Sequence, residues 1–195
     1  MTRPLRDISA SVKQRLLNLS HERGEEFEQV LVRSVAERFL YRLSKSMHAG
    51  SFLLKGAMLF VAWEGMPHRV TRDIDLLGFG DDSLERMTAV MREVAATAVE
   101  DDGLIFDVES VQAAEIRTIQ DYGGVRVSAV ATLGKARIRL QVDVGFGDAV
   151  TPGPEDIEFP TLIDLPRARL RAYPVETVVA EKALGWSSGD SSTRG

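Results

Sequence analysis

The stretch Arg69-Val-Thr-Arg-Asp-Ile-Asp-Leu-Leu77 decides how this chain is interpreted, because it places two aspartates, Asp73 and Asp75, two residues apart. In a β-strand, side chains alternate between the two faces, so both carboxylates point one way while Ile74 and Leu76 point into a core. Carboxylates are ligands that hard cations such as Mg²⁺ prefer, together with substrate phosphates. The stretch predicts either a divalent-cation site or a surface strand end that carries two acids.

A third carboxylate, Asp143, lies in the run Arg139-Leu-Gln-Val-Asp-Val-Gly145. This run is the second arm of a hairpin whose turn is predicted at Leu133-Gly-Lys-Ala136. Alternation places Asp143 on the polar face of an otherwise apolar strand, where an unpaired carboxylate would be costly. Two partners are open at this point: a cation shared with the aspartate pair, or a salt bridge to Arg139 or Arg126.

A glycine turn precedes the aspartate pair. Residues 51–55 read as a short buried strand, Gly56 follows, and residues 57–64 can form a short helix. This layout brings backbone N–H groups and a helix N-terminus close to an anion, so it suits phosphate binding.

The remaining elements follow from periodicity. Apolar residues recur at three- and four-residue spacing over 25–47, and two further helices are expected, one after a start at residues 81–83 and one carrying Lys182. Together these patterns predict an α+β (α/β) fold, with a mixed twisted sheet flanked by helices and an N-terminal amphipathic helix. The strands and later helices are expected at 104–111, 124–132, 136–146, 84–99 and 173–184.

Composition limits the possible functions. The net charge is −5, there is no cysteine and there are three scattered histidines, so disulfides and thiolate zinc sites are excluded and any metal should bind oxygen. No apolar run reaches membrane-spanning length and no secretory signal is evident, so we expect a cytoplasmic protein without a membrane partner.

Two groups of basic residues leave alternatives open. They could form phosphate-contacting surfaces, or they could be a solvated helix face and a charged edge strand. One group is Arg33, Arg38, Arg42, Lys45 and His48, and the other is Arg167, Arg169 and Arg171.

Four blocks carry a resemblance to a known family. They are Phe52-Leu-Leu-Lys-Gly-Ala57, Arg69-Val-Thr-Arg-Asp-Ile-Asp-Leu76, Gln141-Val-Asp143, and Tyr173-Pro-x-Glu176 with Ala180-Glu-Lys182. In this order they resemble the AbiEii/AbiGii-type nucleotidyltransferase toxins, a branch of the DNA polymerase β-like nucleotidyltransferase superfamily. The resemblance implies the nucleotidyltransferase fold.

The resemblance also implies roles for individual residues. Asp73, Asp75 and Asp143 would hold Mg²⁺ or Mn²⁺, and Lys182 would complete the catalytic set by neutralising phosphate charge. Ala57 stands where the family often has a second glycine. Thr71 matches a hydroxyl position that is phosphorylated in some relatives, and is otherwise an ordinary strand residue. The expected nucleotide-binding residues are Lys55, Gly56, Ala57, Arg69, Thr71 and Arg72.

The implied function is that of a toxin from a toxin–antitoxin or abortive-infection system. Such an enzyme uses Mg²⁺ to add nucleotides from an NTP to the 3′ end of tRNA, which blocks translation, and a cognate antitoxin restrains it. Two alternatives remain: an antibiotic nucleotidyltransferase acting on a small molecule, and a catalytically impaired fragment acting by binding.

The predicted organisation has three parts. Residues 1–150 form the core with its N-terminal helix, residues 151–184 a linker and the start of a helical region, and residues 185–195 a disordered tail. The family continues past the lysine helix, so we expect a C-terminally shortened member.

Overall fold

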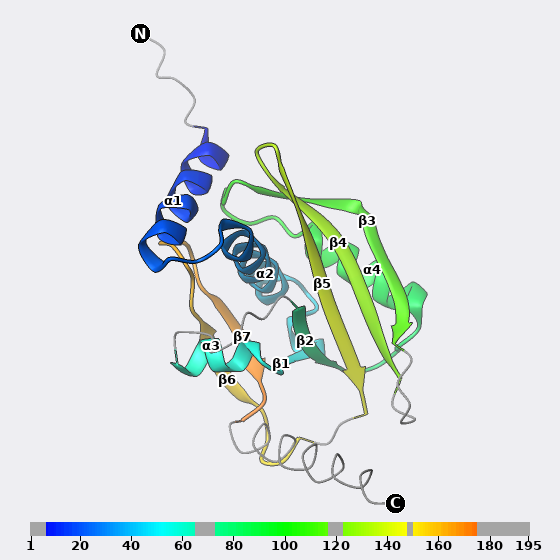
Figure 1. The fold of residues 1–195 in the computed structure, drawn as a ribbon. Coiled ribbons are helices and arrows are strands. Elements are labelled where there is room, and N and C mark those ends of the chain that lie inside the picture. The colour runs from blue at the N-terminus through cyan, green and yellow to red at the C-terminus, as the bar shows by residue number, and fades with distance from the viewer. Residues whose placement is uncertain (1–6, 65–72, 117–122, 148–149, 175–195) are drawn as a thin grey trace, which may run out of the picture.

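The computed structural model describes residues 7–64, 73–116, 123–147 and 150–174. Within them, one seven-stranded sheet organises the protein (Figure 1). The strands are β1 (Phe52–Lys55), β2 (Asp73–Gly78), β3 (Leu104–Ile116), β4 (Gly124–Leu133), β5 (Ala136–Phe146), β6 (Glu155–Phe159) and β7 (Ala168–Ala172). Their order is β3-β4-β5-β2-β1-β7-β6, in which β2 pairs with β5 and β1 with β7 in parallel and the other pairs are antiparallel. The predicted mixed sheet is confirmed.

Helices complete the fold. The helical elements are α1 (Ile8–Arg23), α2 (Phe27–Lys45), the 3₁₀ turn η1 (Ala49–Ser51), α3 (Met58–Glu64) and α4 (Leu84–Ala95). Figure 1 shows α2 in the middle of the molecule, where it packs against β5 and β7, while α4 packs against β3 and β4. In the described residues, no helix is both long and apolar enough to cross a bilayer.

The expected amphipathic helix is present as α2, but it is not the first helix. Another helix, α1, precedes it and packs against it. The Asp7 side chain accepts a hydrogen bond from the Ala10 N–H at the start of α1, and Gly24 ends α1 in the left-handed conformation with φ 63°. This helix was not expected from the sequence, because its buried face is narrow and consists of Val12, Leu16 and Ser20.

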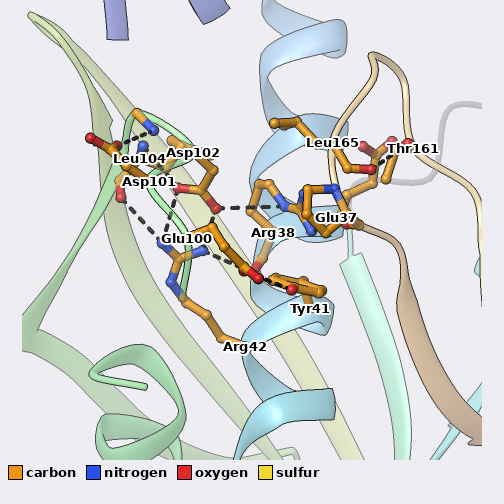
Figure 2. Close-up of polar contacts among 12 residues, drawn as sticks. Glu37, Arg38, Tyr41, Arg42, Glu100, Asp101, Asp102, Leu104, Thr161 and Leu165 are labelled. Atoms are coloured by element: carbon orange, nitrogen blue, oxygen red, sulfur yellow. Dashed lines mark hydrogen bonds and ion pairs between the residues drawn. The ribbon is translucent and has the colours of Figure 1, made fainter. Parts of the chain in front are cut away.

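Three of the five basic residues expected on one exposed helix face are buried, which corrects both readings for Arg38, Arg42 and His48, whereas Lys45 at the end of α2 is exposed. Arg38 and Arg42 are only 1% and 6% exposed, and both face Asp102 in the loop before β3 (Figure 2). Arg42 forms hydrogen bonds with both carboxylate oxygens of Asp102, at 2.8 and 3.1 Å. His48 is 6% exposed and contacts Glu93 of α4 at 2.7 Å. These side chains tie α2 to neighbouring elements and are not available to bind phosphate.

The stretch expected to be a linker contains two strands. β6 and β7 extend the same sheet beyond β1, and the Tyr173 N–H donates to the Leu54 carbonyl at 3.0 Å. β7 lies between β1 and β6, so its arginines are not on an edge strand, and Arg169 lies 3.7 Å from Glu158 of β6. The predicted domain boundaries stay predictions.

Candidate active site

The three candidate carboxylates lie on one face of the sheet, on its two central strands. In the parallel β2–β5 register, Asp75 is opposite Asp143 and Asp73 is opposite Gln141. The intervening residues of β2, Ile74 and Leu76, are 0% and 1% exposed. Burial of these apolar residues fixes the strand's orientation, so Asp73 and Asp75 must point to the opposite face.

Burial and the repulsion between neighbouring carboxylates both affect the pKa of Asp75. Burial, together with the negative charges of Asp143 and Asp73, raises the pKa of Asp75 to about 6, while the Lys55 ammonium acts in the opposite direction. A carboxyl whose charged form is disfavoured by neighbouring carboxylates is stabilised by a cation. The oxygen-only donor set therefore fits a hard divalent ion such as Mg²⁺.

Asp143 already has a partner in this structure. Arg126, opposite it on β4, donates to Asp143 from Nε at 2.8 Å and from Nη2 at 2.7 Å. Among the described residues, no group of three or more His, Asp or Glu side chains forms a ready metal site. Asp73 and Asp75 are candidates to hold a first ion, and Asp143 can join them by sharing its carboxylate between the ion and Arg126 or by releasing Arg126.

The glycine turn lies directly against the aspartates. Gly56 has φ +72°, and a Cβ there would stand 2.1 Å from Oδ2 of Asp75, so only glycine fits. The backbone N–H of Ala57 forms a hydrogen bond with the Asp75 carboxylate. The turn that was predicted to approach a phosphate is therefore joined to the predicted metal ligands.

Lys55 crosses the face of the sheet from β1. It is opposite Asp75 in the β1–β2 register, and its Nζ lies 3.0 Å from where a Cβ on Gly145 of β5 would be. Its Nζ also lies 5.9 Å from the centroid of the Tyr173 ring, which is fully buried. Because Gly145 has no side chain, the Lys55 ammonium has room to lie beside the carboxylates.

Six of the ten predicted site residues lie together in the structure, and the other four are outside the described residues. Asp73, Asp75, Asp143, Lys55, Gly56 and Ala57 form one continuous site. Arg69, Thr71, Arg72 and Lys182 lie outside the described residues. The catalytic and binding roles of all ten residues stay predictions. Gly145 and Tyr173 were not expected at the site. Both lie next to the Lys55 side chain, and this contact is not visible in the sequence.

Comparison with protein families agrees with this geometry. A family model described as the nucleotidyl transferase AbiEii toxin of type IV toxin–antitoxin systems matches residues 38–195. This chain belongs to the AbiEii family. The match covers the three aspartates and the glycine turn, so the family resemblance and the nucleotidyltransferase fold expected from the sequence are confirmed.

Two crystal structures from Helicobacter pylori align with this AbiEii chain. JHP933 gives a TM-score of 0.46 at 16% identity, over 74% of this chain and 52% of that one. The second, a nucleotidyltransferase candidate, gives 0.45 at 15% identity, over 74% and 53%. The chain therefore spans about half the length of these structures. A search of curated proteins finds no match.

Proposed function

We propose that this AbiEii protein is a toxin that uses a divalent cation, Mg²⁺ or Mn²⁺, to transfer nucleotides from an NTP to the 3′ end of tRNA. Transfer to that end would prevent aminoacylation and block translation in the cytoplasm, and a cognate antitoxin would restrain it. Membership of the AbiEii family supports the toxin and its reaction class. The choice of tRNA as acceptor rests on the family resemblance.

One observation carries the catalytic part of this proposal. The parallel pairing of β2 with β5 places Asp75 opposite Asp143, directly beside a glycine turn that contacts Asp75. If Asp73 and Asp75 were only two acids at a surface strand end, neither a third carboxylate nor a glycine turn would be expected beside them. Clustered carboxylates beside a glycine turn suit phosphoryl chemistry, because the carboxylates can hold a cation and the turn's backbone can approach a phosphate.

The residues have distinct roles in the proposed reaction. Asp73 and Asp75 hold the cation, which when bound neutralises charge on the transferring phosphate. The backbone at Gly56 and Ala57, with the Lys55 ammonium, holds the triphosphate. Asp143 orients the acceptor hydroxyl and accepts its proton. The hydroxyl oxygen then bonds to the α-phosphorus, the bond to the β-phosphate bridging oxygen breaks, and pyrophosphate leaves with that electron pair.

The test measures incorporation of each of the four α-labelled NTPs into total tRNA with Mg²⁺. We compare the unaltered protein with Asp75→Asn, which keeps the shape of the side chain but removes its charge. Asp156→Asn is the matched control, because Asp156 is exposed on β6, at the far edge of the sheet. Label should appear at the RNA 3′ end, fall by at least about a hundredfold in Asp75→Asn, and persist in Asp156→Asn.

Other results would point to other functions. Label on an aminoglycoside or another small hydroxylated acceptor, with none on RNA, would replace the tRNA proposal with small-molecule transfer. Absence of label on every acceptor from a folded protein would contradict transferase activity for this chain.

A further inference from the structure

A hollow of about 520 Å³ adjoins the carboxylate cluster on the β5 side. Its walls are the first turns of α2, at Glu28, Leu31 and Val32, and residues 137–141 of β5. Asp73 lies at one end of the hollow, so the cavity opens onto the proposed cation site. The volume falls within the range of about 300–1,000 Å³ that is usual for small-molecule and cofactor sites.

The β5 wall of this hollow carries two arginines, whereas the acids of its lining, Glu28 and Asp73, come from α2 and β2. Arg137 and Arg139 are both exposed, and among the described residues neither has an ion-pair partner. Strand alternation places them on the face that carries Gln141 and Asp143. Neighbouring positions on this face are about 6.8 Å apart. The strand therefore presents a row of cationic side chains that leads to the carboxylates, as a polyanionic chain would require.

The topology separates the two sides of the reaction centre. β2, which carries the aspartate pair, has β1 on one side and β5 on the other. The phosphate turn at Gly56 follows β1, and the hollow lies along β5. In an in-line displacement the attacking and leaving oxygens lie on opposite sides of the phosphorus. If pyrophosphate departs toward the β1 turn, the acceptor must arrive from the β5 side.

We propose that the hollow between α2 and β5 is the acceptor subsite, and that it takes the single-stranded 3′ end of a nucleic acid. Arg137 and Arg139 contact the phosphodiester groups just before the terminal nucleotide, and the 3′ hydroxyl lies at the Asp73 end. This inference rests on the proposed transferase function and adds where its acceptor binds. Arginine suits the role because its planar guanidinium can form two hydrogen bonds with one phosphate.

Removing the charge of Glu28 should change nucleic-acid affinity in the opposite direction to removing the arginines. Glu28 is exposed on the α2 wall of the same hollow, and among the described residues no ion pair involves it. An acid facing a bound phosphate chain weakens binding, so removing its charge should strengthen binding. Arginines that only supported the fold would not produce opposite effects from opposite charges on two walls.

The experiment measures fluorescence anisotropy of a short single-stranded RNA with a free 3′ hydroxyl, titrated with the full chain. The Arg137→Gln/Arg139→Gln double variant should bind at least about fivefold more weakly. Its slope of log affinity against log salt should be shallower by about 1.4, which corresponds to two lost phosphate contacts on a single strand. Glu28→Gln should bind more tightly than the unaltered chain.

Two further measurements complete the comparison. The Arg169→Gln/Arg171→Gln variant removes the same charge from exposed positions on β7 and should leave RNA affinity unchanged. Binding of a non-hydrolysable NTP with Mg²⁺ should be equal in all variants, because the triphosphate lies on the β1 side.

The outcomes separate this inference from the function on which it rests. Equal RNA affinity and salt slope in the Arg137→Gln/Arg139→Gln variant, with normal binding by the unaltered chain, would overturn the subsite and leave the transferase proposal standing. Loss of NTP binding in that variant would also overturn it, because the hollow would then hold the nucleotide. No RNA binding by the unaltered chain would overturn both the subsite and the nucleic-acid acceptor.

Discussion

Arg126 of β4 donates two hydrogen bonds to the Asp143 carboxylate of β5, from Nε at 2.8 Å and from Nη2 at 2.7 Å. Asp143 is largely covered, with 19% of its side chain exposed, whereas the Arg126 side chain is 49% exposed. This pair neutralises one of the three clustered carboxylates in the protein without a bound cation. An ion that binds Asp143 must therefore share the carboxylate with a guanidinium or displace it, and the effect of removing that guanidinium can be measured.

The first prediction concerns cation affinity. Arg126→Gln should bind Mn²⁺ about 1.4- to 5-fold more tightly than the unaltered protein, because an ion pair with one half-exposed partner contributes roughly 0.2–1 kcal/mol. Titration calorimetry or the loss of the free Mn²⁺ electron paramagnetic resonance signal gives this value directly. Arg171→Gln on β7 should leave the affinity unchanged. Weaker Mn²⁺ binding in Arg126→Gln would mean that Arg126 holds Asp143 in the binding geometry.

A second prediction concerns the glycine turn. Gly56→Ala should lower the free energy of unfolding by more than about 2 kcal/mol, because it combines a left-handed backbone with a Cβ that would stand 2.1 Å from Asp75 Oδ2. Gly24→Ala is the matched control, since Gly24 has φ +63° but nothing within 4 Å of an added Cβ. It should cost only about 1 kcal/mol. If chemical denaturation showed equal losses of unfolding free energy in the two variants, Asp75 would have moved to make room for the added Cβ.

The third prediction concerns the buried ion pairs of α2. Asp102→Ala leaves Arg42 and Arg38 with an uncompensated buried charge, so the free energy of unfolding should fall by about 3–5 kcal/mol. Glu109→Ala removes the exposed partner of Arg92, at 3.8 Å, and should change stability by less than about 0.5 kcal/mol. Denaturant unfolding of both variants checks the contrast. A small effect in Asp102→Ala would require water to reach the arginines.

A fourth prediction concerns pH. Burial raises the pKa of Glu37 to about 7 from a usual value of 4.5, although the Leu162 N–H donates to its carboxylate at 3.0 Å. Between these two values the folded protein holds a proton that the unfolded chain has lost, so this group makes stability fall as pH rises from about 4.5 to about 7. Above that range its effect is constant.

Glu37→Gln should remove this part of the pH dependence. The free energy of unfolding at pH 8 should then rise by roughly 3 kcal/mol, because the pKa difference is about 2.5 units and each unit corresponds to about 1.4 kcal/mol. Glutamine keeps an acceptor for the Leu162 N–H. Denaturation curves at several pH values provide the measurement, with Glu155→Gln on the exposed face of β6 as the control. A variant with the same slope as the unaltered protein would assign the pH dependence to another group.

Much of the site could be predicted because its determinants are local. Alternation in β2 and β5 correctly gave the faces of the three aspartates, and the hairpin turn was placed correctly. The position of that turn also decides which of the two arginines offered as partners lies opposite Asp143. Pairing Leu133 with Ala136 and continuing along both strands places Arg126, and not Arg139, opposite Asp143.

Other features depend on contacts between distant parts of the chain. Arg38 and Arg42 of α2 could not be recognised as buried, because their partner Asp102 follows Arg42 by 60 residues and nothing local links them. For a related reason β6 was not expected, and β7 was offered only as a charged edge strand. Their alternation is short, and β7 is placed by its parallel pairing with β1, which sequence periodicity does not reveal.

The parallel pairing of β2 with β5 has a consequence for synthesis of the protein. Between these strands the chain forms α4, β3 and β4, so Asp75 and Asp143 come together only after this intervening segment has folded. Such long-range pairing forms late, because the entropy of closing the loop opposes it until the surrounding contacts exist. A ribosome translating this message therefore carries a growing chain whose aspartate cluster is incomplete until residue 143 has emerged, and the translation machinery is not exposed to the assembled site while the first strands are being made.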